Sequence, residues 1–288
     1  MKSKVYFSKE ITGEKVLEMY KGLGRELGGR VAVKVHSGEV GNQNFLRPDF
    51  WRPILNHVGG TVVECNTAYD GERNTTAKHL AAIKLHGWTE FPVDLMDAEG
   101  PDLELAIPEG KRIQKNYVGK NLENYDSLLV LSHFKGHPMG GYGGALKQLS
   151  IGIASSFGKA YIHGAGVPEH IWSADHDSFL ESMADAAKSI THRFGDRALY
   201  VNVMKNMSVD CDCCAVVEDP CMKDIGILIS TDPVAIDQAC IDLVYAATDD
   251  PGQKHLLERI ESRDGIHTIE AAAALGIGQR EYQLIEIQ

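Results

Sequence analysis

Short runs of β-branched and other apolar residues alternate along this chain with longer segments in which apolar residues recur at helical spacing. The short runs predict strands at residues 4–7, 31–35, 61–65, 93–95, 103–107, 127–131, 198–203 and 224–229. The longer segments predict helices at residues 14–27, 48–57, 75–86 and 177–194, and others that begin near residues 144 and 232. This alternation predicts an α/β fold, in which a mostly parallel sheet is flanked by helices.

The chain contains no internal repeat, low-complexity tract or obvious linker. We therefore expect one structural unit over residues 1–288. A division into two α/β lobes near residues 100–125 stays open, although nothing in the sequence forces a boundary there.

The composition is that of an ordinary soluble globular protein, with 43% hydrophobic and 24% charged residues among 288. The net charge of −11 argues against a nucleic acid or an anionic membrane as partner, because both require a concentrated positive surface. The net charge describes the whole chain, and it is compatible with a basic pocket at one place on the protein. The first residues contain no signal peptide, and no apolar run is long enough to span a bilayer, so we expect a cytoplasmic protein.

The unusual polar residues follow predicted strands. His36, Glu39 and Arg47 come after one apolar run, His133 comes after another, and Cys211 comes after a third. In parallel α/β sheets, ligands bind at the carboxyl ends of the strands. We therefore expect these loops to converge on one pocket.

The loop after residue 131 is rich in groups that can move protons or bind anions. His133 and His137 lie on either side of Lys135. Imidazoles exchange protons near neutral pH, so we interpret these three residues as catalytic groups, with the histidines as alternative metal ligands. The competing interpretation is a flexible glycine turn with solvent-exposed histidines.

The glycines that follow predict a turn in which main-chain N–H groups can approach a ligand closely. Gly143 and Gly144 lead into a predicted helix whose N-terminus favours an anion, and Lys147 lies in its first turn. The segment lacks the Gly-Lys-Ser/Thr ending of a phosphate loop, so ATP binding is not indicated. We place Gly143, Gly144 and Lys147 among the residues that bind a small anion.

His36, Glu39 and Arg47 complete the candidates for anion binding. An arginine after a loop of glycine and asparagine can hold a carboxylate or phosphate with two hydrogen bonds. A surface salt bridge is an equally good interpretation of Arg47 and Glu39.

Four of the six cysteines, Cys211, Cys213, Cys214 and Cys221, lie within eleven residues. In a reducing compartment, such a cluster is typical of metal ligands or redox-active thiols rather than structural disulfides. Zinc or an iron–sulfur cluster is the natural partner, although the spacing fits neither standard pattern. Because neighbouring side chains of extended backbone point apart, Cys213 and Cys214 are not expected to share one ion.

We therefore expect a metal site built on Cys211 and Cys213, joined by Cys221 or by a histidine such as His133. The alternative is that one or two of the four cysteines are reactive or simply buried thiols. Cys65 and Cys240, which stand alone, are interpreted as small buried hydrophobic residues.

Four motifs are spread over the chain: His133-Phe134-Lys135-Gly136-His137, the glycine-rich loop at 140–144, Cys211-Asp212-Cys213, and the segment 225–238. Together they resemble the DUF362 family, whose members are often described as iron–sulfur centre proteins. The resemblance covers nearly the whole chain. It implies an iron–sulfur cluster or another metal at the cysteines.

One departure from the family pattern limits what the resemblance implies. Many members carry an inserted ferredoxin-like module with eight ligand cysteines. This chain has no cysteine between His163 and Cys211, so the electron-transfer function of that module does not carry over. The cysteines at 211–221 are then the only cluster or metal site that the resemblance implies.

The chain also has a more distant similarity to the nickel-dependent lactate racemase family. In that family a histidine, a glycine-rich turn and a lysine lie in a similar order, and the lysine holds a nickel-pincer cofactor. His133, Gly143, Gly144 and Lys147 are the matching positions, although the spacing between the glycines and the lysine differs. The similarity implies α/β lobes with a site at strand ends and a nickel-type cofactor.

These observations predict a metal- or iron–sulfur-binding protein that carries out redox or proton-transfer chemistry on a small anionic substrate. Lys135, Lys147 and Arg47 would hold the charge of that substrate. Two alternatives stay open: a non-catalytic electron carrier or metal- or cluster-delivery protein, and a thiol-redox protein without metal. A redox partner protein and a homo-oligomer stay open as well.

Overall fold

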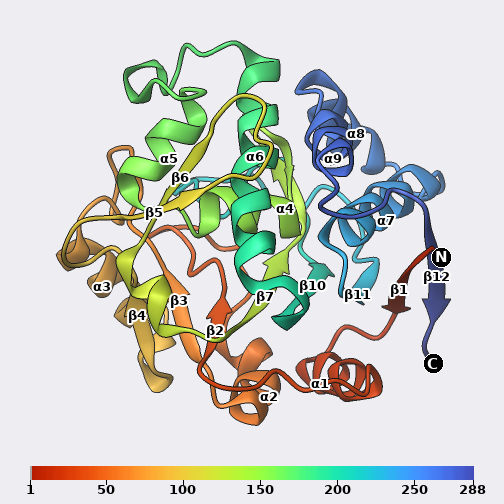
Figure 1. Ribbon diagram of the computed structural model, residues 1–288. Helices are drawn as coiled ribbons and strands as arrows, with labels where there is room; N and C mark the ends of the chain where they lie inside the picture. The colour runs from red at the N-terminus through yellow and green to blue at the C-terminus, as the bar shows by residue number, and fades with distance from the viewer. Residues whose placement is uncertain (1) are drawn as a thin grey trace.

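The fold is built on an eight-stranded sheet with the strand order β12-β1-β11-β10-β7-β2-β3-β4 (Figure 1). The computed structural model describes residues 2–288. The strands of this sheet are β1 (Ser3–Ser8), β2 (Val31–Lys34), β3 (Thr61–Glu64), β4 (Val93–Leu95), β7 (Ser127–His133), β10 (Ala198–Met204), β11 (Gly226–Ser230) and β12 (Tyr282–Glu286). Within it, β11 pairs antiparallel with β1 and β10, and the other described pairs are parallel. The predicted α/β class with a mostly parallel sheet is therefore confirmed.

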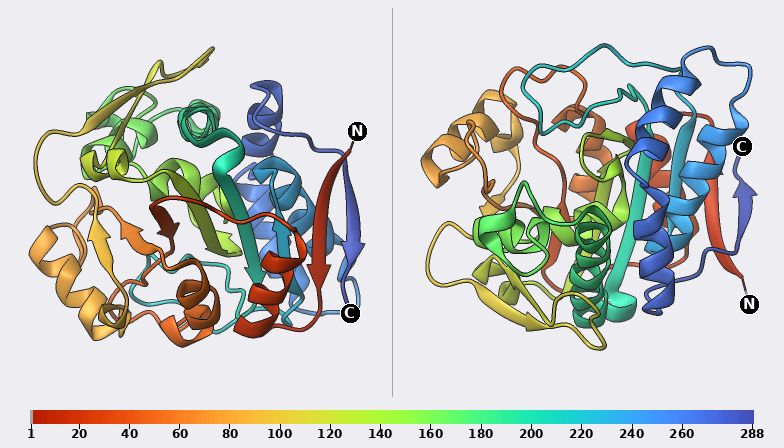
Figure 2. Two further views of the ribbon diagram at one scale, coloured as in Figure 1. Left: turned by 60° about the horizontal axis from the view of Figure 1, so that its bottom comes forward. Right: turned by 90° about the horizontal axis from the view of Figure 1, so that it is seen from above.

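Helices cover both faces of the sheet (Figure 1 and Figure 2). Strand β7 shows the reason, because Leu128 and Val130 pack into one core cluster, whereas Leu129 and Leu131 pack into the other. A strand buried on both faces forms a continuous apolar run, which is how the sequence predicted β7. The helices are α1 (Gly13–Gly22), α2 (Pro48–Val58), α3 (Thr76–Leu85), α4 (Ala145–Lys147), α5 (Ser156–His163), α6 (His176–Phe194), α7 (Pro233–Ala246), α8 (Gln253–Ser262) and α9 (Ile266–Ala274).

Each predicted strand corresponds to an observed strand, but one predicted helix is wrong at its end. The helix expected over residues 14–27 ends at Gly22. Gly24 adopts φ +62, in the left-handed region that terminates a helix. The apolar residues beyond it continue the helical spacing by coincidence.

Residues 135–143 form a hairpin rather than a flexible turn. Strands β8 (Lys135–His137) and β9 (Gly141–Gly143) pair antiparallel in a separate two-stranded sheet. A Cβ atom at Gly136 would lie 2.2 Å from the carbonyl oxygen of Val209, so only glycine lets the hairpin pack against that segment. The hairpin is thereby held next to the cysteine-rich loop that follows β10.

The helix expected after the glycines is short. Three residues of α4 are followed by a π-helical turn over Gln148–Gly152. The main-chain N–H groups of Ala145 and Leu146 donate to the two carboxylate oxygens of Asp237 in α7, at 2.8 and 2.9 Å. Asp237 therefore occupies the N–H groups that the sequence assigned to a ligand anion.

A second small sheet lies in the region where a lobe boundary stayed open. It pairs β5 (Leu103–Ala106) with β6 (Lys115–Val118) in antiparallel register. A core cluster that includes Ile107, Ile162 and Phe179 packs this region against α5 and α6.

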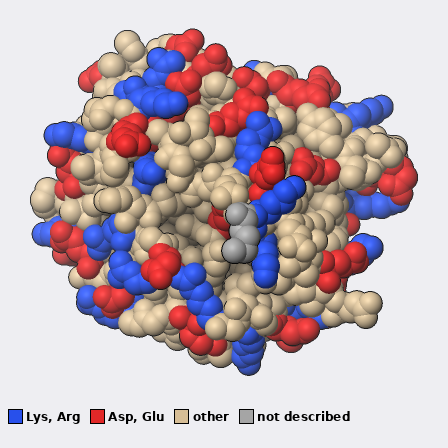
Figure 3. Space-filling model, turned by 45° about the vertical axis from the view of Figure 1, so that its right-hand side comes forward, with Lys and Arg blue, Asp and Glu red and all other residues tan. Residues whose placement is uncertain are grey.

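Both chain ends lie at the β1–β12 edge of the sheet (Figure 1). No helix among the described residues is both long enough and apolar enough to cross a membrane. On the face drawn in Figure 3, basic and acidic side chains are interspersed over the surface.

Replacing Asp237 by asparagine tests how α4 is anchored. The buried carboxylate accepts hydrogen bonds from Ala145, Leu146, Tyr142 and Asn202. An asparagine amide would turn its NH₂ group toward one of these donors, so we expect the free energy of unfolding in urea to fall by about 2–3 kcal/mol. Asp249→Asn, in an exposed turn after α7, is the control and should change it by less than about 0.5 kcal/mol. Equal effects of the two variants would contradict the anchoring role.

Candidate functional site

A cavity of about 530 Å³ lies at the carboxyl ends of β2, β3, β7 and β10. The predicted site residues that line it are His36, His133, Lys135, His137, Gly143, Gly144, Lys147, Cys211, Cys213 and Cys214. The expected convergence of the strand-end loops on one pocket is therefore observed.

Two predicted anion-binding residues lie outside the lining of this cavity. Arg47 is exposed, and its guanidinium lies 4.0 Å from the centroid of the Phe45 ring. Glu39 is buried, and its carboxylate accepts a hydrogen bond of 3.2 Å from Nε of Arg73. The arginines that line the cavity are therefore Arg73 and Arg263, and Arg47 is not among them.

Cys221 also lies apart from the other cysteines of its segment. Its thiol donates to the carbonyl oxygen of Met207 at 3.3 Å, and it lines a different cavity. Cys65 and Cys240 are fully buried, as expected, and all six cysteines are free thiols.

The cysteine loop is fixed by the carboxylate of Asp212. This carboxylate accepts hydrogen bonds from Nδ1 of His133 at 2.9 Å and from Nζ of Lys135 at 2.8 Å. Burial alone would raise the pKa of Asp212, but the charges of His133 and Lys135 outweigh burial and hold this pKa well below its ordinary value. The loop after β10 is thus joined to the end of β7 and to β8.

His133 is satisfied on both sides of its ring. Nδ1 faces Asp212, and Nε2 lies 2.5 Å from the carbonyl oxygen of Lys205, which can only accept a hydrogen bond. The ring therefore has no free nitrogen directed into the cavity, and its role in this structure is to position Asp212.

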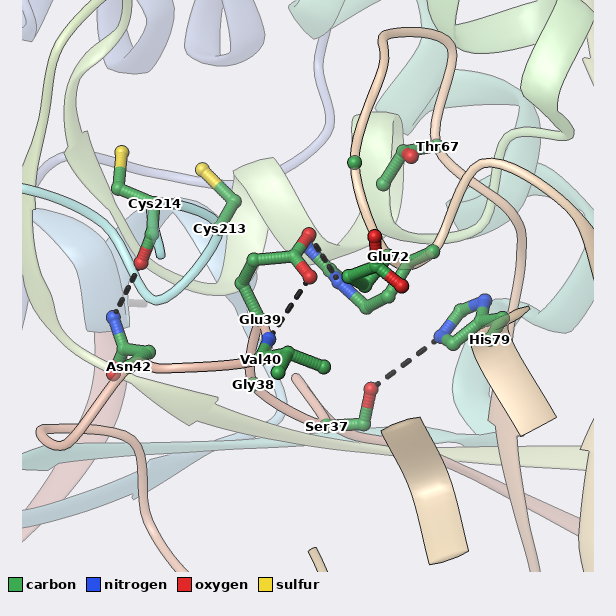
Figure 4. Close-up of polar contacts among 12 residues, drawn as sticks. Ser37, Gly38, Glu39, Val40, Asn42, Thr67, Glu72, His79, Cys213 and Cys214 are labelled. Atoms are coloured by element: carbon green, nitrogen blue, oxygen red, sulfur yellow. Dashed lines mark hydrogen bonds and ion pairs between the residues drawn. The ribbon is translucent and has the colours of Figure 1, made fainter. Parts of the chain in front are cut away.

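Cys211 to Cys214 form a turn rather than extended backbone. The N–H of Cys214 donates to the carbonyl oxygen of Cys211 at 2.9 Å, and Asn42 donates to the carbonyl oxygen of Cys214. Figure 4 shows the sulfur atoms of Cys213 and Cys214 on the same side of this turn. The expectation that these two side chains point apart is therefore wrong, because it assumed extended backbone.

Among the described residues, one group of three ligand atoms is close enough to share a metal ion. These are an imidazole nitrogen of His137 and the sulfur atoms of Cys211 and Cys213, all within 4.8 Å of one another. This His/Cys group could bind a metal, because imidazole and thiolate are the ligands that zinc prefers.

The hydrogen bonds of His137 identify which nitrogen carries its proton. Nδ1 accepts from the main-chain N–H groups of Met139 and Gly140, at 3.2 and 2.9 Å. Burial lowers the pKa of His137 to about 3, so the ring is neutral and its hydrogen is on Nε2. Nε2 lies 3.9 Å from the sulfur of Cys213, to which it can donate.

The imidazole of His36 resembles that of His137, because its Nδ1 atom also accepts a hydrogen bond from the main chain. Its Nδ1 accepts from the N–H of Gly38 at 3.1 Å, and its ring lines the cavity together with Cys211. Burial lowers the pKa of His36 to about 4, so this ring is also neutral near physiological pH. A hydrogen bond with Cys211 lowers the pKa of Cys213, but a hydrogen bond with Cys214 and burial outweigh it and raise this pKa, so the structure favours the thiol form of Cys213.

The cavity is lined by more cations than the sequence suggested. Lys34 forms a buried ion pair with Glu64 at 2.6 Å. Burial lowers the pKa of Lys34; it would raise that of Glu64, but the charge of Lys34 outweighs it and lowers the Glu64 pKa. Lys147 and Lys159 also line the cavity, without a carboxylate partner among the described residues.

Sequence reasoning missed several residues of the lining. Lys34 and Glu64 could have been found, because each is a charged residue in an otherwise apolar strand. Arg73, Lys159 and His163 carried no such signal, because none of them lies in a predicted strand and each is buried only by tertiary packing.

The sequence profile of the DUF362 family, described as "Domain of unknown function (DUF362)", matches residues 31–242, which is more than half of the chain. The chain belongs to the DUF362 family, and the predicted resemblance is confirmed. A comparison with curated proteins gives no match.

Two solved structures have a weak likeness to the chain, each at 15% identity. A protein from Thermotoga maritima has a TM-score of 0.46, with 92% of this chain and 60% of that chain covered. The lactate racemase apoprotein from Thermoanaerobacterium thermosaccharolyticum has a TM-score of 0.39, with 69% of this chain and 50% of that chain covered. The chain thus spans less than two thirds of either protein, and the scores are too low to assign an activity or a cofactor.

Replacing Asp212 by asparagine tests the interaction that fixes the cysteine loop. Because the pKa of Asp212 is lower in the folded than in the unfolded protein, its carboxylate stabilises the fold above about pH 4 and loses this effect as the pH falls. We expect Asp212→Asn to lower the free energy of unfolding in urea by about 3 kcal/mol at pH 7, and by less at pH 3.

Asp210→Asn is the control, because it removes a part-exposed ion pair of 2.7 Å with Arg259 two residues away. It should cost less than about 1 kcal/mol. A loss in Asp212→Asn that is equally large at pH 7 and pH 3 would contradict the assignment of the ionised carboxylate.

Proposed function

We propose that this protein is an enzyme that acts on a small anion bound in the cavity, beside one thiophilic metal ion such as zinc held by Cys211 and Cys213. The observation that supports this most strongly is that the sulfur atoms of Cys211 and Cys213 lie within 4.8 Å of each other and of an imidazole nitrogen of His137. The group faces a cavity that is also lined by Lys135 and Lys147, which can hold the charge of an anion.

The donor set fits a single ion better than an iron–sulfur cluster. Clusters of the [2Fe–2S] and [4Fe–4S] types are held by four cysteine thiolates. Of the cysteines near the cavity, Cys211, Cys213 and Cys214 face it, whereas Cys221 lies in another cavity. A nickel cofactor gains no support either, because His133, the matching histidine, has both nitrogens occupied.

His137 fits as a hydrogen-bond donor to a bound thiolate rather than as a ligand. An imidazole that binds a metal generally donates its other N–H to an acceptor, but Nδ1 of His137 itself accepts from main-chain N–H groups. We therefore assign the ion to the two sulfur atoms, with His137 donating to that of Cys213. A zinc ion held there would supply a Lewis acid that polarises an oxygen of the substrate.

The lysines next to this group hold the substrate in the proposed mechanism. A Cβ atom built at Gly143 would lie 3.5 Å from Cε of Lys135 and 3.8 Å from Cδ of Lys147, so both lysines lie beside this glycine. Lys135 is held by Asp212, whereas Lys147 has no such partner among the described residues. Lys147 is therefore the lysine available to bind an anion beside the sulfur atoms.

A thiol-redox function without a metal is the second candidate. The turn brings together Cys211 and Cys214, which have the spacing of a redox-active pair. A hydrogen bond with Cys213 lowers the pKa of the Cys214 thiol. A Cys214 thiolate of this kind can attack one sulfur of a disulfide substrate, which forms a mixed disulfide and releases the first substrate thiol. Cys211 then attacks the sulfur of Cys214, which closes the Cys211–Cys214 disulfide and releases the second substrate thiol, so that two electrons pass to the substrate.

Metal analysis of protein purified without oxygen tests the first proposal. We expect about one thiophilic ion per chain in the wild type, and at least a tenfold lower content in Cys211→Ser/Cys213→Ser, because both sulfur ligands are lost. Cys221→Ser is the matched control and should keep the wild-type content, since this thiol lies in another cavity. A wild-type protein free of metal, or equal loss in the control, would overturn the proposal.

Thiol labelling separates the two candidates. A bound ion should slow the reaction of Cys211 and Cys213 with iodoacetamide by about tenfold or more relative to chelator-treated protein, because a coordinated thiolate is a poor nucleophile. Mass spectrometry of the labelled peptides gives both rates, with Cys221 as internal control. Equal rates before and after chelation, together with a Cys211–Cys214 disulfide after mild oxidation, would select the thiol-redox candidate instead.

A further inference from the structure

We infer that the inner part of the cavity binds a small dianion, such as a dicarboxylate or a phosphate monoester, through Lys147 and Lys159. The inference rests on the proposed function, because the dianion is the small anion of that proposal. The groups that would bind it are nevertheless separate from the sulfur atoms, so the two ideas can fail independently.

The charges around the cavity are not balanced. Three lining cations have a buried carboxylate partner: Lys34 pairs with Glu64, Arg73 with Glu39, and Lys135 with Asp212. Lys147, Lys159 and Arg263 have none among the described residues. Arg263 is exposed to solvent, whereas the ammonium groups of Lys147 and Lys159 belong to part-buried and buried residues. These two ammonium groups face the cavity without a carboxylate partner, and a ligand of two negative charges would supply the missing charge.

Lys159 is the more unusual of the two lysines. Its side chain is 7% exposed, and its Nζ donates only to the carbonyl oxygens of Cys65 at 3.4 Å and Ala154 at 2.5 Å. Carbonyl oxygens satisfy hydrogen bonds but do not neutralise the charge, so a buried ammonium group of this kind is unfavourable unless an anion joins it. An anion that enters the cavity relieves this cost.

Two further groups supply directed hydrogen bonds. Nη2 of Arg73 and Nδ1 of His163 are buried without a partner among the described residues, and both side chains line the cavity. His163 lies one turn after Lys159 in α5. Burial and the charges of Lys147 and Lys159 lower the pKa of His163 to about 3, so its ring is neutral. A neutral imidazole N–H and a guanidinium N–H can each donate to an oxygen of the ligand.

The main chain contributes little to this site. The N–H groups at the start of α4 donate to Asp237, so they are not available to an anion. Lys147 ends α4 and is followed by the π-helical turn over Gln148–Gly152, a feature that is frequent at functional sites. The proposed dianion site therefore depends on side chains, which substitutions can remove one at a time.

Calorimetric titration at low ionic strength, with malonate, inorganic phosphate and acetate as probes, tests the inference. We expect malonate and phosphate to bind about tenfold or more tightly than acetate, because acetate compensates only one lysine. The same preference should appear in Cys211→Ser/Cys213→Ser, which lacks the sulfur ligands. Equal affinities for all three probes would overturn the dianion site, and binding that disappears only in the cysteine variant would assign it to the sulfur atoms instead.

Single substitutions identify the residues involved. Lys159→Met and Lys147→Met should each weaken malonate binding by about tenfold or more. Lys188→Met is the matched control, because Lys188 also donates to a carbonyl oxygen, that of Leu275, but lies outside the cavity lining. If Lys159→Met does not fold, Lys147→Met carries the test, since Lys147 is part-exposed. Unchanged affinity in Lys147→Met, or an equal loss in the control, would overturn the assignment.

Discussion

One buried carboxylate, that of Asp212, determines the geometry of the candidate site. It lies between Cys211 and Cys213 in the chain, and it accepts hydrogen bonds from His133 and Lys135. A buried carboxylate without partners is strongly unfavourable, so these three charged groups are stable only together. Because they come from the loop after β10, the end of β7 and the hairpin strand β8, their pairing decides where both sulfur atoms lie relative to the cavity.

The pairing of buried charges also distinguishes the other cations that line the cavity. Lys34, Arg73 and Lys135 have buried carboxylate partners, but Lys147 and Lys159 are left without one in a chain whose net charge is −11. The neutral imidazole of His137 meanwhile directs its N–H group toward the sulfur atom of Cys213. The site thus combines sulfur atoms that can bind a metal with cations that attract an anion, whereas an ordinary polar core would have each charge paired.

The sequence predicted the elements whose burial is visible in the local pattern. The apolar run of β7 and the polar residues after it were enough to place His133 and Lys135 at a strand end. Arg73 and Lys159 could not be found in this way, because their burial depends on packing between distant segments. The hairpin of β8 and β9 was missed because its short strands consist mostly of glycine and polar residues and contain no β-branched run. Arg47 was expected in the site but lies on the surface against Phe45.

X-ray absorption spectroscopy of the metal in protein purified without oxygen tests the central claim most directly. If Cys211 and Cys213 hold one thiophilic ion, the first shell contains two sulfur atoms at about 2.3 Å, the distance typical of zinc and thiolate. The His137→Gln variant should leave that shell unchanged, because His137 donates to sulfur and does not bind the ion. A shell of oxygen and nitrogen alone, or one of four sulfur atoms, would contradict the account.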